Sequence, residues 1–226
     1  MHSKNIHSIG GVIIRDIRIA VRSGGAWLMG LVFFAVFLSL TAIALGGDFK
    51  TLRPLAPALI WLAVVFSLLF SFEHLFADDV RDSSLEHIKL SGMSMSAYVL
   101  AKICAHWLLC ILPLILALPL AGLMLGLPEA LLMGLFVSLV IASPALVCYG
   151  AFAGACLVGF RAGGFLLVVL TIPLLVPVLI FALGGVISYP EAGVLAPEFK
   201  ALAGISLIAT AVGIPAAAAA LNTVME

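Results

Sequence analysis

The polar segment 72–107 contains the residue types and spacings from which this chain could build a site. It carries eight of the 22 charged residues: Glu73, Asp78, Asp79, Arg81, Asp82, Glu86, Lys89 and Lys102. It also carries three of the five histidines, which are His74, His87 and His106. Because almost all of the remaining chain is apolar, this segment is where a soluble partner could dock or where chemistry could occur.

The familiar catalytic motifs are absent from the sequence. A phosphate-binding loop ends in Gly-Lys, and none of the five lysines follows a glycine. Neither the H-E-x-x-H nor the G-x-S-x-G motif occurs. The four cysteines lie in apolar runs without C-x-x-C spacing, which favours buried small side chains over a metal site or disulfides. We therefore expect no catalytic residue, no metal site and no directly bound cofactor.

The composition is that of a membrane protein. Hydrophobic residues make up 64% of the 226 residues, and the mean hydropathy is +1.30. Uncharged runs of about 20 residues can cross a bilayer as helices, which satisfy their own backbone hydrogen bonds. The sequence predicts one all-α domain over residues 1–226 with six transmembrane helices at 26–46, 55–72, 98–125, 130–158, 165–187 and 201–221.

The basic residues indicate the orientation of these spans. Eight of the 11 lysines and arginines fall on the side that holds both termini, and three fall on the other. By the positive-inside rule, both termini, the polar segment and the Arg161 turn are predicted to be cytoplasmic. The net charge of zero gives no electrostatic support for a nucleic-acid partner.

Residues 5–22 are predicted to form an amphipathic helix at the membrane interface. Ile6, Ile9, Ile13, Ile17 and Ala20 share one side, and Arg15, Arg18 and Arg22 form a stripe on another. Membrane lipid is the partner that this pattern suits. The alternative is an ordinary cytoplasmic lead-in.

Residues 77–97 are predicted to form a short cytoplasmic segment between the second and third spans. Asp78, Asp82 and Glu86 follow one another at i,i+4 spacing, and such repeated like charges are mildly unfavourable on a helix. A basic surface on a partner would explain them, and a solvated helix end is the plainer alternative. Ser83 and Glu86 have capping-box spacing, so a helix could restart there. A helix placed in this way could pass the motion of a soluble motor to the two spans.

Two stretches resemble a known family. Residues 75–90 (LFADDVRDSSLEHIKL) and 100–114 (LAKICAHWLLCILPL) are similar to the heme exporter protein B family, the permease subunit of the cytochrome c maturation system. The resemblance covers nearly the whole chain, including the six spans and the turn that begins at Arg161. One departure is visible, because the family often has glycine where Ser83 stands.

The resemblance implies an ABC-2-like permease in the bacterial inner membrane that pairs with a separate ABC ATPase subunit. It further implies other cytochrome c maturation membrane proteins and the heme chaperone as partners, heme as the handled ligand, ATP bound by the partner, and room for a homodimer. The predicted contact with the ATPase consists of Asp78, Asp79, Asp82, Leu85 and Glu86.

His74, His106 and Trp107 are predicted polar residues near the cytoplasmic membrane edge. Imidazole is a common axial ligand of heme, but neither histidine has a clear paired ligand. Packing or interfacial hydrogen bonding is therefore the favoured interpretation of both, and Trp107 suits an interfacial anchor.

Two other functions suit the sequence less well. An autonomous transporter or channel would work without ATP, but the spans carry no charge through their centres. An intramembrane enzyme would require paired polar groups at mid-membrane depth, which the spans do not show.

Overall fold

Six helices of the described chain are long and apolar enough to cross a membrane, as predicted. The computed structural model describes residues 8–23, 26–82, 85, 88, 90, 92–158 and 163–224. In order, the elements are α1 (Ile9–Ser23), α2 (Ala26–Ala44), α3 (Phe49–Phe72), α4 (His74–Arg81), α6 (Met95–His106), η2 (Trp107–Ile111), α7 (Leu112–Leu125), α8 (Glu129–Leu157), α9 (Gly163–Ala192), η3 (Gly193–Leu195) and α10 (Pro197–Val224). The chain is a multi-pass, all-α membrane protein.

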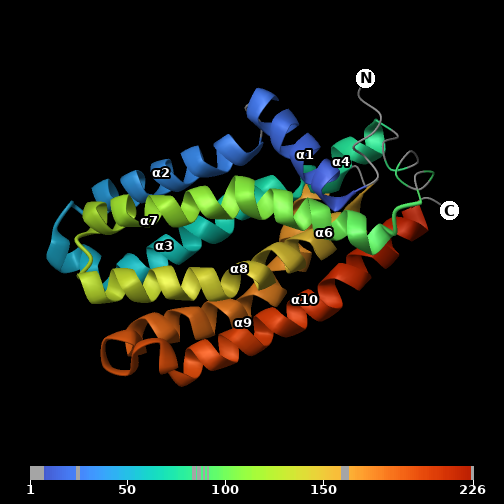
Figure 1. Ribbon diagram of the computed structural model, residues 1–226. Coiled ribbons are helices and arrows are strands. Elements are labelled where there is room, and N and C mark those ends of the chain that lie inside the picture. Colours follow the sequence, from blue (N-terminus) through green and yellow to red (C-terminus); the bar gives the residue numbers. More distant parts are fainter. Residues whose placement is uncertain are drawn as a thin grey trace.

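The spanning helices form one bundle with α3 at its centre (Figure 1). Of the most apolar 18-residue window in each span, 67% is buried for α3, against 17% for α2 and 28% for α9. Large apolar side chains on α2, α7, α9 and α10 remain exposed, as expected for surfaces that face lipid tails. Displacement of α3 would therefore disturb the bundle more than displacement of any edge helix.

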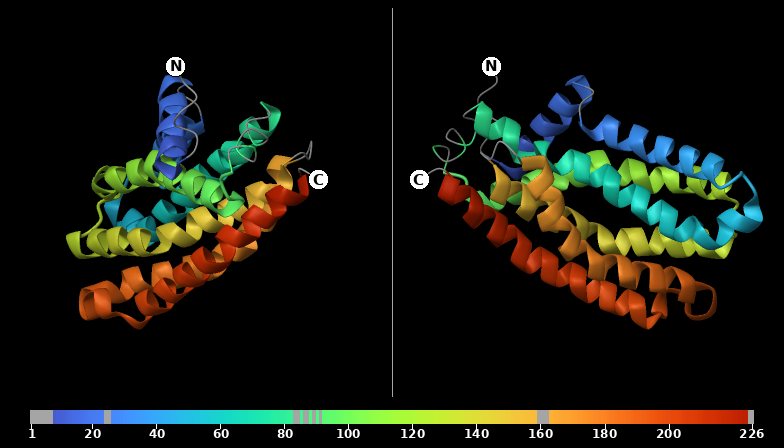
Figure 2. Two further views of the ribbon diagram at one scale, coloured as in Figure 1. Left: turned by 45° about the vertical axis from the view of Figure 1, so that its right-hand side comes forward. Right: turned by 180° about the vertical axis from the view of Figure 1, so that it is seen from behind.

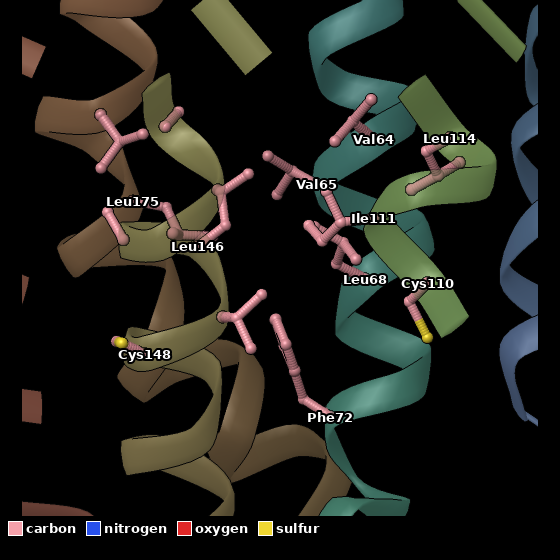
Figure 3. Close-up of a cluster of buried hydrophobic side chains, with 14 of the residues drawn as sticks. Val64, Val65, Leu68, Phe72, Cys110, Ile111, Leu114, Leu146, Cys148 and Leu175 are labelled. Carbon is pink, nitrogen blue, oxygen red and sulfur yellow. The ribbon is translucent and has the colours of Figure 1, made fainter. Parts of the chain in front are cut away.

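Apolar side chains from four segments of the chain meet around α3 (Figure 3). Figure 3 shows Val65 and Leu68 of α3 between Leu146 of α8 on one side and Ile111 of η2 on the other. Leu68, Ile111 and Leu146 are at most 1% exposed. These buried apolar side chains extend from the polar end of the bundle to its middle.

Small residues let the helices approach closely. A Cβ atom at Gly150 of α8 would lie 2.3 Å from the ring of Phe72, and one at Gly30 of α2 would lie 2.9 Å from the backbone oxygen of Ser67. Such approaches are typical of membrane helices, which associate through packing and not through the hydrophobic effect. The last turn of α3 is therefore held against α8 with little spare room.

Both ends of the chain return to one end of the bundle, as six spans require. The helix α1, the helix α4 and the last turns of α10 lie at that end (Figures 1 and 2). The turns between α2 and α3, α7 and α8, and α9 and α10 lie at the opposite end. Gly126, with a φ of 65°, ends α7 in the left-handed conformation that glycine favours.

Several helix boundaries differ from the predicted ones. Residues 47–54 were expected to form the loop between the first two spans, but only residues 47 and 48 of that range precede α3. The Asp48 side chain accepts a hydrogen bond from Lys50 N, so α3 begins at Phe49. At the same end of the bundle, α9 extends past its predicted end to Ala192, and α10 begins earlier than predicted, at Pro197. Proline suits the first helical position because its missing N–H group needs no partner there.

The third predicted span is one helix with a wide turn inside it. The segment α6 passes into the π-helical turn η2 and then into α7, and Leu112 N donates to Trp107 O across this turn. Pro113 follows immediately and lacks the N–H group that a regular α-helix would use. The π turn therefore accommodates this proline within the span.

Candidate functional site

The helix α4 follows α3 after the single residue Glu73, whose backbone is also helical, and ends at Arg81. Its inner face carries Leu75 and Phe76, which are 7% and 1% exposed. Its outer side carries Asp78, which is exposed, and the exposed Asp82 follows directly after the helix. The sequence allowed a break with a restart at Ser83, and in the structure α4 ends at Arg81 with Asp82 as its C-cap.

Asp79 points the other way, into a cluster of charges from three helices. Arg15 Nη2 lies 3.0 Å from Asp79 Oδ1 and 2.8 Å from Asp16 Oδ1. Lys102 Nζ lies 2.9 Å from Asp16 Oδ2 and 2.8 Å from Asp79 Oδ2. The hydroxyl of Tyr98 donates a further hydrogen bond to Asp79 Oδ2. We call Arg15, Asp16, Asp79 and Lys102 the ionic cluster.

The ionic cluster is closed and electrically neutral. Each of its two cations contacts both of its carboxylates, and the four side chains are only 11–22% exposed. Burial lowers the pKa of Arg15, but Asp79 and Asp16 outweigh burial, so this pKa lies above its ordinary value. A partly buried charge is tolerated when it is paired and hydrogen-bonded, and here all four charges are.

Helical spacing explains how each partner reaches the cluster. On α1, Asp16 follows the fully buried Val12 by four residues, so both point toward α6. On α6, Tyr98 and Lys102 are also four residues apart. Arg15, Asp16, Tyr98 and Lys102 were not predicted as site residues from the sequence. The signal was Asp16, a carboxylate on the side of an amphipathic helix that packs against the protein.

The outward side of α1 is mixed. Ile14 and Val21 are 56% and 61% exposed, and Arg18 and Arg22 are exposed beside them. The apolar stripe predicted on α1 coincides only partly with the face that packs against the protein. Ile9 of the stripe is 39% exposed, whereas the fully buried residue is Val12, which was not in the stripe. A helix with exposed isoleucine and arginine side chains on one face has the composition of an interfacial helix.

Glu73, at the junction of α3 and α4, lies against the beginning of α9. A Cβ atom at Gly164 would lie 3.0 Å from Glu73 Oε2 and 3.3 Å from Oε1. A carboxylate near a helix N-terminus interacts favourably with the helix dipole. The α3–α4 junction therefore lies close to the beginning of α9, in addition to the tie between α4 and the ionic cluster.

The predicted histidines lie in different surroundings. His74 is exposed at the start of α4. His106 is 7% exposed, its Nε2 lies 3.1 Å from Ser71 Oγ, and its imidazole stacks on Phe72 with centroids 5.2 Å apart. His106 is therefore packed and hydrogen-bonded against the last turn of α3, and its role stays a prediction.

Trp107 is half-buried against the core. Its indole Nε1 donates to Ser143 Oγ over 2.9 Å, and Ser143 is the middle residue of α8. The hydrogen-bond partner of Trp107 thus lies half a span away from either end of α8, and the role of an interfacial anchor stays a prediction.

The predicted ATPase contact is divided by the structure. Asp78 and Asp82 are exposed, Asp79 belongs to the ionic cluster, and Leu85 is 3% exposed among apolar side chains. Burial makes Leu85 part of the core and not of an outward surface. Glu86 and the Ser83 of the predicted capping box lie outside the described residues. Contact between this end of the bundle and an ATPase stays a prediction, and Asp78 and Asp82 are the described carboxylates placed to make it.

Comparison with known proteins gives a consistent match along the chain. The family model described as CcmB protein matches residues 8–224. Heme exporter protein B of Haemophilus influenzae is 43% identical over 171 residues, which is 76% of this chain and 77% of that protein. Heme exporter protein B of Paracoccus denitrificans is 38% identical over 211 residues, 93% and 97% of the two chains. The protein of the same name from Escherichia coli K12 is 35% identical over 167 residues, 74% and 76% of the two chains.

Proposed function

The chain belongs to the CcmB protein family, and on this premise we propose that it is the permease subunit of a heme exporter that serves cytochrome c maturation. In this proposal a separate cytoplasmic ABC ATPase supplies the energy, and the chain itself carries out no catalysis. The observation that supports it most is the family match over residues 8–224, which includes all six spans and α4.

The geometry of α4 suits the reception of movement. Its outer side presents Asp78, and Asp82 follows at its end, which together form an acidic surface for a basic partner. Its inner face is anchored by Phe76. Because α4 continues α3 after one helical residue, a push on α4 would tilt the most buried span of the bundle.

The remaining assignments follow the same premise. The relatives are named heme exporters, so we propose heme as the handled ligand, released to a heme chaperone with other cytochrome c maturation membrane proteins. We place the chain in the bacterial inner membrane with α1, α4 and both termini at the cytoplasmic face, α1 against the lipid surface, and two copies in the complex. ATP is bound by the ATPase and not by this chain.

Reconstitution separates this function from that of an autonomous transporter. The purified chain in liposomes is expected to move no heme on its own, and ATP-dependent activity should require the ATPase and the other components. ATP-independent movement of heme by the chain alone would contradict the proposal.

Charge reversal tests the acidic surface. Asp78→Lys combined with Asp82→Lys should lower co-purification of the ATPase by about tenfold or more, because attraction to a basic surface becomes repulsion. Membrane insertion should be unchanged, since both side chains are exposed. Unchanged co-purification together with unchanged cytochrome c formation would remove these two residues from the contact.

A further inference from the structure

We propose that Arg15, Asp16 and Lys102 are positioning residues that, through Asp79, hold α1 and α4 on α6 as one unit. The inference deepens the proposed function, because it rests on α4 as the element that receives the movement of the ATPase. The physical tie itself depends only on the chain described here.

The contacts of α1 make the ionic cluster its principal polar attachment to α4 and α6. Val12 is the one fully buried apolar side chain among the described residues of α1, and Ile14 and Val21 point away from the protein. At its other end, Trp27 Nε1 donates to Ala20 O over 3.0 Å and joins α1 to α2. Ile13 is partly buried beside Val12, and the printed polar contact of α1 with α4 runs from Arg15 to Asp79, while Asp16 reaches Lys102 of α6.

The arrangement of charges distinguishes this tie from ordinary packing. Asp79 is the only described residue of α4 in the cluster, and it receives Arg15 from α1 and Lys102 and Tyr98 from α6. Removal of Asp16 alone leaves an excess positive charge, and removal of Lys102 alone leaves an excess negative charge. Removal of both leaves Arg15 and Asp79 paired, so the two changes together should be less harmful than either one.

The consequence for function is that α1 follows α4. Movement of α4 would reach α3 through the chain and reach α6 and α1 through the ionic cluster. Because Ile14, Arg18 and Val21 face outward from α1, this helix would slide along the membrane surface as α4 moves.

The accessibility of position 12 reports whether α1 is seated. The experiment uses inside-out membrane vesicles that hold the full chain and measures the rate at which a membrane-impermeant maleimide labels Val12→Cys. A chain that retains Val12 is the blank, because it gives the labelling of the four native cysteines. Asp82→Cys, exposed on the cytoplasmic side, gives the rate of a free thiol. The test changes are Asp16→Asn, Lys102→Gln and the two combined, and Arg18→Gln on the exposed side is the matched control.

Each single change should raise the labelling rate of position 12 about tenfold or more, because an uncompensated charge in a poorly solvated site drives the helices apart. The combined change should stay within about threefold of the parent, and Arg18→Gln should have no effect. Tyr98→Phe, which removes a hydrogen bond and no charge, should raise the rate only a few-fold. Unchanged labelling in both single variants, or a combined variant as exposed as they are, would overturn the proposal.

The same variants are then assayed in cells for cytochrome c formation and for the ATPase that co-purifies. Asp16→Asn and Lys102→Gln should lower cytochrome c formation while the ATPase stays bound, because Asp78 and Asp82 are untouched, and the combined variant should restore it. Full activity in single variants whose position 12 has become accessible would refute the coupling of α1 to α4. Absence of an ATPase even from the parent chain would refute the proposed function instead, and the labelling result would still decide the tie.

Discussion

At the scale of single residues, neighbouring carboxylates of one short helix have different surroundings. Asp78 and Asp82 are exposed, whereas Asp79 contacts Arg15, Lys102 and Tyr98. The sequence predicted an acidic segment, but it could not show which carboxylate faced inward. That depends on α1, whose Arg15 precedes Asp79 by 64 residues.

The removal of one negative charge should therefore have unequal effects on the two sides of α4. Asp79→Asn should destabilise the protein by about 2–3 kcal/mol, because it leaves two cations with one carboxylate in a site that keeps some contact with water. Asp82→Asn should change stability by less than about 0.5 kcal/mol. Thermal unfolding of the purified protein in detergent checks this, and equal melting temperatures for the two variants would contradict the assignment of Asp79.

His106 shows a similar limit of sequence-based prediction. Packing and hydrogen bonding were the favoured interpretation of His106, and the structure supplies Ser71 and Phe72 as its neighbours. These neighbours could not be predicted, because they depend on how α6 packs against the end of α3.

At the scale of the elements, hydropathy and length identified all six spans, and local chemistry decided their ends. Asp48 and Pro197 start helices inside stretches that were expected to be loops. Polar residues and prolines that precede an apolar run can belong to its helix when they occupy the N-cap or the first turn. Hydropathy alone is insensitive to these signals.

The contact between α3 and α8 gives a prediction at this scale. Gly150→Ala should destabilise the protein by about 1–3 kcal/mol, because the new methyl group would overlap the Phe72 ring, which is also stacked on His106. Gly204→Ala in α10 is the matched control, since nothing lies within 4 Å of the position of its Cβ atom. Melting temperatures in detergent measure both, and a Gly150→Ala protein as stable as the control would show that the helices are not packed this closely.

At the scale of the whole molecule, the even number of spans brings α1, α4 and the end of α10 to one end of the bundle. This could be predicted from the sequence, because six spans return the chain to its starting side and the lysine and arginine residues are unequally divided. The tie between α1 and α4 could not, since it joins residues that are far apart in the chain and that no periodic pattern relates.

The orientation itself is open to direct measurement. In spheroplasts, an impermeant maleimide should label Lys200→Cys, because Lys200 is exposed at the end opposite α4. Asp82→Cys should be labelled only in inside-out vesicles. The reverse pattern would place the acidic surface outside the cell, where no ATPase could reach it.

The central claim is that the acidic surface at α4 touches an ATPase. A photo-cross-linking amino acid placed at Asp82 in the full chain, in native membranes, tests it most directly, with the same amino acid at Lys200 as control. The account predicts that irradiation joins position 82, and not position 200, to a subunit with a nucleotide-binding phosphate loop. Cross-linking of position 82 only to lipid or to another copy of this chain, in membranes that support cytochrome c formation, would contradict it.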